Sequence, residues 1–194
     1  AGMKTFDLET PAAPDPGRLR WPRRWEVSGD EAAPAGNQHY QDLTAASWAD
    51  VFRVLEVEAA LVRRLEDALD PSGEASRVEA ELDGQRDDDD ETPLRGLDLG
   101  VASAVLVLAA AGAVPVASCN GGAFGGVHMG ANPYVACYIR PRRFLTVSGW
   151  AVRAGLLQIV TEDGVLVLHA RQVKDFLRFA ELALTDQALP VDRA

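Results

Sequence analysis

The pattern of apolar and polar positions predicts one long amphipathic helix in the first half of the chain. Ser47 and Asp50 have the spacing of a capping box, in which a hydroxyl and a carboxylate satisfy the first free amides of a helix. From there to the Asp70-Pro71 pair, apolar side chains recur at helical spacing and must pack either on the chain's own core or on a partner. The stripe comprises Trp48, Val51, Leu55, Val62, Leu65 and Leu69, and the solvated side comprises Glu56, Glu58, Arg63, Arg64 and Glu66.

The second half of the chain predicts an α+β core. Asp98 or Ser103 can start its first helix and Gly112 can end it, while Pro141 suits the first turn of a later helix. The segment Glu162-Asp163-Gly164 favours a tight hairpin turn. Two strand pairs and several helices indicate an antiparallel or mixed four-stranded sheet with helices packed on one face, plus the N-terminal amphipathic helix. The predicted elements are helices over 98–111, 141–154 and 173–184 and strands at 114–118, 134–139, 156–161 and 165–169.

The regions before this core differ from it in composition. Residues 1–42 contain five of the eleven prolines and few aliphatic side chains, so this segment cannot bury enough apolar surface to fold alone. Trp21 and Trp25 leave two interpretations, an arm docked on its own domain or a partner, or plain disorder. The acidic run at 87–91 favours a solvated linker over a metal site. The predicted organisation is an arm over 1–42, the amphipathic helix over 43–70, an acidic linker over 71–97, the α+β core over 98–186 and a tail over 187–194.

Charge and composition narrow the classes of function. The 194 residues carry a formal net charge of −10, and residues 1–97 alone carry 22 acidic and 11 basic side chains, so the predicted core is nearly neutral. A nucleic-acid partner is not expected, because such a protein presents a basic face. The longest apolar stretch, 101–117, is interrupted by Gly112 and Pro115 and indicates a helix and a strand rather than a bilayer span. With two cysteines and no signal-like segment, the sequence predicts a soluble cytoplasmic protein; its arginine-rich, lysine-poor composition suggests a bacterial gene.

The candidate chemistry lies in the loop after the first core strand. Glycines at this density allow positive φ, and successive free amides can form an anion-binding concavity. A cysteine just past a strand end is expected to be exposed, and a histidine in the same loop can act as its base. The predicted catalytic residues are Cys119 and His128, and the predicted ligand-binding residues are Ser118, Asn120, Gly121, Gly122, Gly125 and Gly126.

A structural interpretation of the same loop stays open, with Cys119 a small buried residue and the glycines only making a turn. The loop matches neither a phosphate-binding nor a dinucleotide-binding motif, and no cofactor can be named. Cys119, His128 and His169 lack the paired spacing of a zinc site, so no metal is predicted. Cys137 is expected in the core. His169 is expected to be structural unless it points toward the strand ends that carry the loop.

A basic group is expected at the far end of the core. If the strands 114–118 and 134–139 are adjacent and antiparallel, the arginine that follows the second strand lies at the end opposite the Cys119 loop. Pairing with the acidic N-terminal half is then the simpler role for these arginines, and an anion or RNA-backbone site the alternative. The group comprises Arg140, Arg142, Arg143 and Arg153.

The element Ser118-Cys119-Asn120-Gly121, which follows a helix and precedes a loop and a second strand, resembles the Ser-Cys-Ser-Gly element of the wybutosine-synthesis tRNA methyltransferase family. The resemblance covers little more than residues 98–139, and this chain lacks the arginine that follows the glycine in that family. It implies methyl transfer from S-adenosylmethionine to a tRNA base, against which the neutral-to-acidic charge counts. The chain looks more like a member of an uncharacterised bacterial family that shares the local element.

Two hypotheses of function follow. In the first, a small-ligand-binding or enzymatic α+β domain uses the Cys119 loop as its pocket, with Asn120 orienting a polar group and His128 acting as acid or base. In the second, a non-catalytic interaction protein engages a partner or a second copy of the chain through the helix at 47–69 and the arm. The partners that the sequence allows are therefore a small-molecule ligand and a homodimer, and not a membrane.

Overall fold

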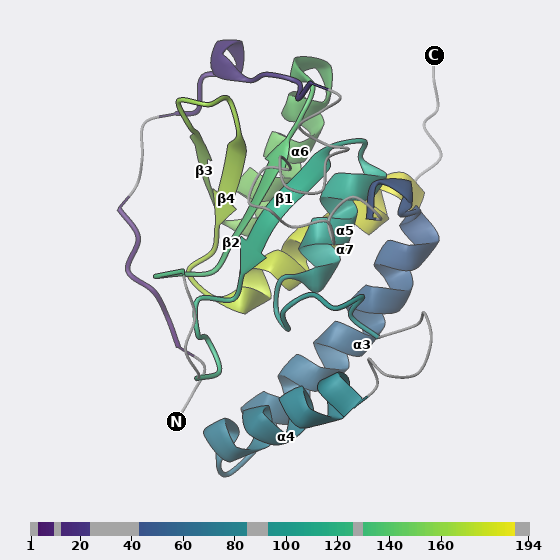
Figure 1. Cartoon of the computed structure of the whole chain (residues 1–194), viewed down its shortest axis with the longest axis vertical. Helices are drawn as coiled ribbons and strands as arrows, with labels where there is room; N and C mark the ends of the chain where they lie inside the picture. Colours follow the sequence, from purple (N-terminus) through teal and green to yellow (C-terminus); the bar gives the residue numbers. More distant parts are fainter. Residues whose placement is uncertain (1–3, 10–12, 24–42, 85–92, 126–129, 189–194) are drawn as a thin grey trace.

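A computed structural model of the chain describes residues 4–9, 13–23, 43–84, 93–125 and 130–188. Within this part, five α-helices and a four-stranded sheet form an α+β fold (Figure 1). The sheet is antiparallel throughout, which decides between the two sheet types that the sequence left open. The α-helices are α3 (Trp48–Asp67), α4 (Pro71–Gly84), α5 (Ala102–Ala110), α6 (Pro141–Ala154) and α7 (Val173–Ala188), the 3-10 helices are η1 (Pro16–Arg18) and η3 (Leu43–Ala45), and the strands are β1 (Val114–Cys119), β2 (Tyr134–Tyr138), β3 (Leu157–Val160) and β4 (Leu166–His169).

The strands follow the spatial order β1-β2-β4-β3, so β2 pairs with β4 and not with its neighbour in sequence, β3. The β3–β4 hairpin turns at Gly164, whose φ of +77° confirms the predicted turn. The register of β1 shifts between Pro115 and Ala117, because a proline has no N–H to give to the ladder. Cys119 pairs with Tyr134 and Val114 with Tyr138, so Arg140, which follows β2, lies at the end opposite Cys119, as predicted.

Helices α5, α6 and α7 pack against one face of the sheet (Figure 1). The inward residues of this face include Val135 and Leu168, and they join the main core. Helix α5 is buried along almost its whole length. The opposite face of the sheet carries a second, smaller apolar cluster made of Val114, Val116, Ala136 and Tyr138.

The amphipathic helix is confirmed as α3, and its capping box is present at the predicted residues. Ser47 Oγ accepts from the Asp50 amide at 3.3 Å, and Asp50 Oδ2 accepts from the Ser47 amide at 2.8 Å. Except for Leu69, the stripe packs on the chain's own core, against α5 and α7, and the Trp48 ring meets Trp150 of α6 edge to face at 5.9 Å. Two assignments were wrong: Glu58, placed on the solvated side, is fully buried, and Leu69, placed on the stripe, is fully exposed beyond the end of α3.

The acidic linker predicted over 71–97 is helical in its first half. Helix α4 starts at Pro71, which suits a first helical turn, and Asp70 accepts from the Gly73 amide at 3.1 Å. Ala75 and Val78 are buried three residues apart, which gives α4 a short apolar side. Figure 1 shows α4 folded back beside α3. The acidic run at 87–91 lies outside the described residues.

Helix α5 begins at Ala102, later than the 98–111 range predicted from Asp98. Gly100 has a φ of +94°, which lies outside the helical region, so one helix cannot run from Asp98 through this position. Helix α7 reaches Ala188, four residues beyond the predicted end and into the predicted tail. Helix α6 has the predicted bounds, with Pro141 at its start and Gly155 in a left-handed conformation at its end.

The described parts of the N-terminal arm dock on the chain's own domain. The Phe6 amide donates to the carbonyl of Arg171 at 2.9 Å, and Phe6 is buried. Arg20 donates to the Tyr138 hydroxyl at 2.9 Å and to the carbonyl of Asp163 at 2.6 Å. Trp21 lies against the guanidinium of Arg140, 4.0 Å from the ring centroid. These contacts favour the docked interpretation for residues 4–9 and 13–23.

Candidate functional site

Gly121 and Gly122 form a tight turn directly after β1. Their φ angles are +64° and +68°, and the Ala123 amide donates to the carbonyl of Asn120 at 3.1 Å, as in a type I′ turn. A Cβ on Gly121 would lie 2.4 Å from the carbonyl carbon of Asn132, so a larger residue would collide with backbone there. These glycines therefore bring the start of the loop against its end.

The amides of this loop form hydrogen bonds within the loop. The Gly121 amide donates to Cys119 Sγ at 3.3 Å, and the Gly122 amide donates to Asn120 Oδ1 at 3.0 Å. The Gly125 amide donates to the carbonyl of Gly122 at 3.1 Å. The expectation of a concavity of free amides is therefore wrong for these three glycines, because their own turns use the donors.

Asn120 ties the loop to the segment before α5. Its side chain is 4% exposed, and Nδ2 donates to the carbonyl of Leu99 at 3.2 Å. Its amide donates to Asp98 Oδ2 at 3.4 Å. Since Oδ1 already accepts from the Gly122 amide, both ends of the side-chain amide are occupied within the protein. Asn120 is thus placed to position the loop.

Cys119 is the last residue of β1 and is 6% exposed, so the expectation of an exposed thiol is wrong. The returning end of the loop covers it. A Cβ on Gly130 would lie 3.2 Å from Cys119 Sγ and 3.0 Å from a ring carbon of Tyr134, so the Gly130 backbone lies over both side chains. The Cys119 thiol is therefore covered by the backbone at Gly130.

The other predicted residues have different outcomes. Ser118 is half-buried and Gly125 is exposed. Gly126 and His128 lie outside the described residues, so the pairing of His128 with Cys119 stays a prediction. Cys137 is confirmed as a core residue: it is fully buried, and burial raises the pKa of its thiol to about 12.

A row of three reactive side chains lies at the strand ends that carry the loop. Cys119 pairs with Tyr134, and Tyr134 pairs with His169, on the adjacent strands β1, β2 and β4. Directly paired residues project to the same face of a sheet, and Tyr134 packs with the apolar cluster on the face away from the helices. His169 therefore meets the condition under which the sequence gave it a role in the site, because it lies at the same strand ends as the loop. We call Cys119, Tyr134 and His169 the strand-end row.

His169 is held in one orientation by the end of the loop. Its Nδ1 lies 2.9 Å from Oδ1 of Asn132. Because a carbonyl oxygen only accepts, Nδ1 carries the proton of this bond and Nε2 is left as a proton acceptor. Burial lowers the pKa of His169 below 6.5, which favours this neutral form near neutral pH.

Tyr134 lies between the other two members of the row. Its ring centroid is 6.2 Å from that of His169. Burial raises the pKa of the phenol, and the neighbouring Cys119 and Asp98 raise it further, so the hydroxyl keeps its proton and can donate. Adjacent strands are about 4.8 Å apart, so the backbones of Cys119 and His169, two strands apart, are separated by about 10 Å, with Tyr134 between them.

Glu58 of α3 is bound to the start of α5. Its Oε1 accepts from the amides of Gly100 and Ala102, each at 2.8 Å, and its Oε2 accepts from the Ser103 amide at 2.9 Å. Burial raises the pKa of Glu58 above 4.5, while its interactions with Ser103 and with the amides of Ala102 and Gly100 act in the opposite direction. A carboxylate from one helix thus caps the first turn of another, as anions do at helix N-termini.

The position of Glu58 in the sequence indicated burial, although its charge suggested exposure. Glu58 stands three residues after Leu55 and four before Val62, which is the spacing of the apolar stripe itself. A charged residue inside an apolar stripe indicates either a break in the stripe or a buried partner. Here the partner is backbone, which no side-chain pattern can reveal.

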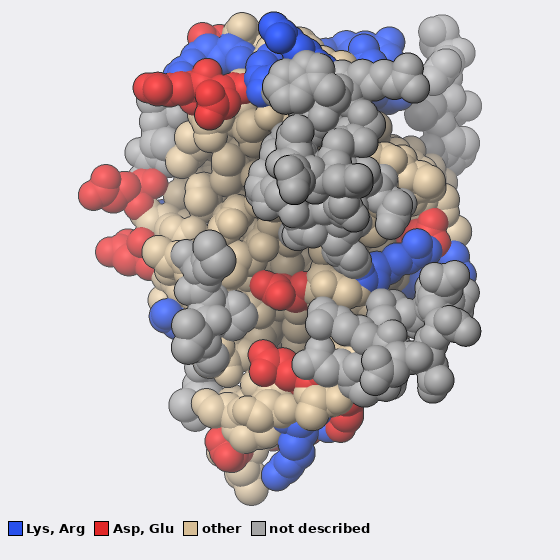
Figure 2. Space-filling view, viewed as in Figure 1, with Lys and Arg blue, Asp and Glu red and all other residues tan. Residues whose placement is uncertain are grey.

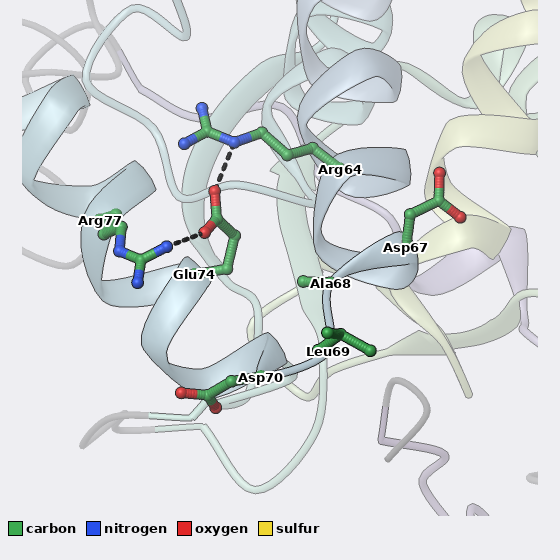
Figure 3. Close-up of a pocket in the computed structure, with 7 residues that line it drawn as sticks. All are labelled: Arg64, Asp67, Ala68, Leu69, Asp70, Glu74 and Arg77. Carbon is green, nitrogen blue, oxygen red and sulfur yellow. Dashed lines mark hydrogen bonds and ion pairs between the residues drawn. The ribbon is translucent and has the colours of Figure 1, made fainter.

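A charged hollow of about 450 Å³ lies where α3 passes into α4 (Figure 3). Glu74 accepts from Arg64 at 2.5 Å and from Arg77 at 2.6 Å, and Arg64 also binds Glu81. These opposite charges neutralise one another. Three of the charged side chains that line the hollow are thus paired with one another, and its lining also includes Asp67, Asp70 and the fully exposed Leu69.

Charge elsewhere is also segregated. Figure 2 shows basic side chains gathered where η1 meets the start of α6, the region of Arg140 and Arg142.

The described residues hold no cluster of three or more histidine, cysteine, aspartate or glutamate side chains arranged to bind a metal ion. None of the helices in that same part of the chain combines the length and the apolar character needed to cross a bilayer.

No protein-family model, curated protein or solved structure matches the chain. The likeness of the Ser118–Gly121 segment to the wybutosine-synthesis methyltransferases therefore remains a likeness of four residues and their flanking elements.

Proposed function

We propose that the chain is a small-ligand-binding domain whose ligand contacts the strand-end row. The observation that supports this most directly is the register, which sets Cys119, Tyr134 and His169 at one level of three adjacent strands. A thiol, a phenol and an imidazole together offer a hydrogen-bond donor, an acceptor and aromatic faces within one ligand's reach. A small-molecule site usually consists of a few polar groups among apolar side chains. The strand-end row has this composition, because it lies beside the apolar cluster on the outer face of the sheet.

The chemistry of the row favours a neutral or cationic ligand over an anion. The amides of Gly121, Gly122 and Gly125 already have acceptors, so they offer nothing to a phosphate or carboxylate. Asp98 adds a negative charge close enough to act on Tyr134. A polar molecule with an aromatic ring fits these groups, because ring faces and a phenol hydroxyl can bind it together.

The same geometry ranks binding ahead of thiol catalysis. Tyr134 separates His169 from Cys119 in the row, so His169 is placed to accept a proton or hydrogen bond from a bound molecule. A catalytic role for Cys119 with His128 remains the enzymatic form of this proposal. The two described cysteines are not in a disulfide, in keeping with the cytoplasmic location that the composition suggests.

The test is a screen of soluble polar metabolites by ligand-observed NMR against the full chain. Compounds that bind the wild type are expected to lose binding to Tyr134→Phe and to Gly130→Ala. The first change removes one hydroxyl, and the second narrows the space over Cys119 and Tyr134. Tyr138→Phe is the matched control, since Tyr138 lies on the same face of β2 at its other end. Hits that bind all four proteins equally would contradict the proposal.

A second candidate function, protein–protein interaction, is favoured by one observation on the other side of the molecule. Helices α3 and α7 border a groove of about 640 Å³, and Phe52 on its edge is 53% exposed. An exposed aromatic side chain beside a groove lined by both apolar and charged side chains is typical of interaction surfaces. The two functions occupy different regions and can coexist.

A further inference from the structure

The outward side of α3 carries a second stripe, distinct from the one buried in the core. Phe52, Glu56, Ala59 and Arg63 follow one another at steps of four, three and four residues, the spacing of a helix-pairing seam. Phe52, Glu56 and Arg63 are exposed and Ala59 is half-buried. We call these four residues the outer stripe. Leu55, together with Glu181, Leu184, Thr185 and Ala188 of α7, completes the lining of the groove beside it.

The charges of this groove are without ionic partners among the residues that the structure describes. Glu56, Arg63 and Glu181 form no ion pair there, whereas Arg53, Arg64 and Glu66 on the same helix do. Opposite charges on one surface, none of them paired with a described residue, are complementary to a surface of the same kind. The outer stripe therefore has the charge pattern of a self-complementary surface.

The order of the charges selects one orientation of a paired helix. Glu56 and Arg63 are seven residues apart, or about 10.5 Å along the helix axis. In an antiparallel pair of α3 helices, Glu56 of each copy faces Arg63 of the other, and the small Ala59 lies near the crossing point. In a parallel pair, like charges face each other at both positions, which is destabilising.

Helix α7 provides the rest of the surface. Its beginning lies near the end of α3, where Lys174 pairs with Glu66, and its end lies near the start of α3, where Ala188 and Phe52 line the same groove. Helices α3 and α7 are thus antiparallel. An α3 helix from a second copy, antiparallel to the first, would run in the same direction as α7 and lie between the two.

We propose that the groove between α3 and α7 binds α3 of a second copy of this chain, with the copies related by a two-fold axis near Ala59. Each Glu56 binds the Arg63 of the other copy, and each Phe52 is covered by the opposing chain. A two-fold interface uses the same patch twice, which a stripe with one acidic and one basic position can satisfy by itself. A fully unrelated partner would need no such symmetry in the charges.

The test measures the self-association of the full chain by sedimentation velocity over a concentration series. Wild type is expected to dimerise reversibly. Arg63→Glu and Glu56→Arg are each expected to raise the dimer dissociation constant by at least about tenfold, because each change turns two attractive contacts into two repulsive ones. The double variant Glu56→Arg/Arg63→Glu restores both pairs and is expected to return the constant close to wild type. Arg142→Glu makes the same charge change on α6 and serves as the control.

Two outcomes overturn the proposal. One is a dimer whose affinity the double variant fails to restore, since the Glu56–Arg63 pair is then not at the interface. The other is a chain that stays monomeric throughout the series. All the substituted residues are exposed, and far-UV circular dichroism checks that each variant is folded.

Discussion

Helix α3 carries its charges in two contrasting settings. In its middle, Glu58 is fully buried and accepts three backbone amides from the start of α5. Near its end, Arg64 forms an ion pair with Glu74 of α4 (Figure 3) and another with Glu81 of α4. Both pairs are in contact with solvent. The first arrangement joins one carboxylate to backbone atoms that cannot move independently of the core. The second joins long side chains that can rearrange.

The difference shows that the number of ionic contacts does not measure their contribution to stability. Glu58 has no ion pair with a described residue, yet replacing it would leave three buried donors without an acceptor. Arg64 has several charged neighbours, yet water can replace each of them. The contribution follows burial and the cost of the unsatisfied group, because desolvation and not attraction dominates inside a protein.

The largest effect is expected from Glu58→Ala. Three buried amides lose their acceptor, and the free energy of unfolding is expected to fall by about 3–5 kcal/mol. Urea denaturation followed by circular dichroism measures the change. Glu58→Gln is the matched control: it keeps one oxygen acceptor and is expected to lose markedly less. Because glutamine keeps the volume of glutamate, equal losses in the two variants would show that neither the volume nor the retained acceptor contributes, and would contradict this expectation.

A smaller effect is expected in the pH dependence of stability. The pKa of Glu58 is raised in the folded state, so between 4.5 and that raised value the folded state holds more proton than the unfolded state. Stability from this group is therefore fully present below 4.5 and declines as the pH rises through the folded-state pKa. Urea midpoints measured at rising pH should fall more steeply for wild type than for Glu58→Gln. Parallel curves would show that Glu58 does not titrate in this range.

The smallest effect is expected from Arg64→Ala. The urea midpoint should stay close to wild type, because exposed pairs contribute little to global stability. Amide hydrogen exchange, in contrast, should show faster exchange in α4, which Arg64 ties to α3 through Glu74 and Glu81. A large fall in the midpoint would remove the contrast between the two settings. Arg53→Ala, which removes an exposed arginine paired within the first turns of α3, serves as the comparison.

Local signals made much of the fold predictable. The capping box at Ser47, the helix ends at Pro141 and Gly155 and the hairpin at Gly164 each depend on a few adjacent residues, and each lies where the sequence placed it. Helix α4 was missed because its apolar side is marked by few residues, Ala75, Val78 and the half-buried Leu82, within a polar segment. Such a helix depends on tertiary packing, which a short window does not show.

The candidate site was predictable only in part, for a similar reason. Cys119 and its glycine turn could be located because they are continuous in sequence. Tyr134 and His169 join them only through the pairing of β2 with β4, two strands that are not neighbours in the chain. Strand order of this kind depends on contacts between distant segments. The internal bonding of the loop amides likewise needs coordinates.

The capping of α5 by α3 has a consequence for how the chain is made. During synthesis α3 leaves the ribosome before α5, so the carboxylate that stabilises the first turn of α5 is already present when that turn emerges. The apolar α5 has no side-chain cap of its own and would otherwise face water on all sides. A chain that begins after α3 would deliver this helix uncapped and uncovered. The nascent chain is therefore expected to aggregate more, and to depend more on chaperones, when residues 48–67 are absent.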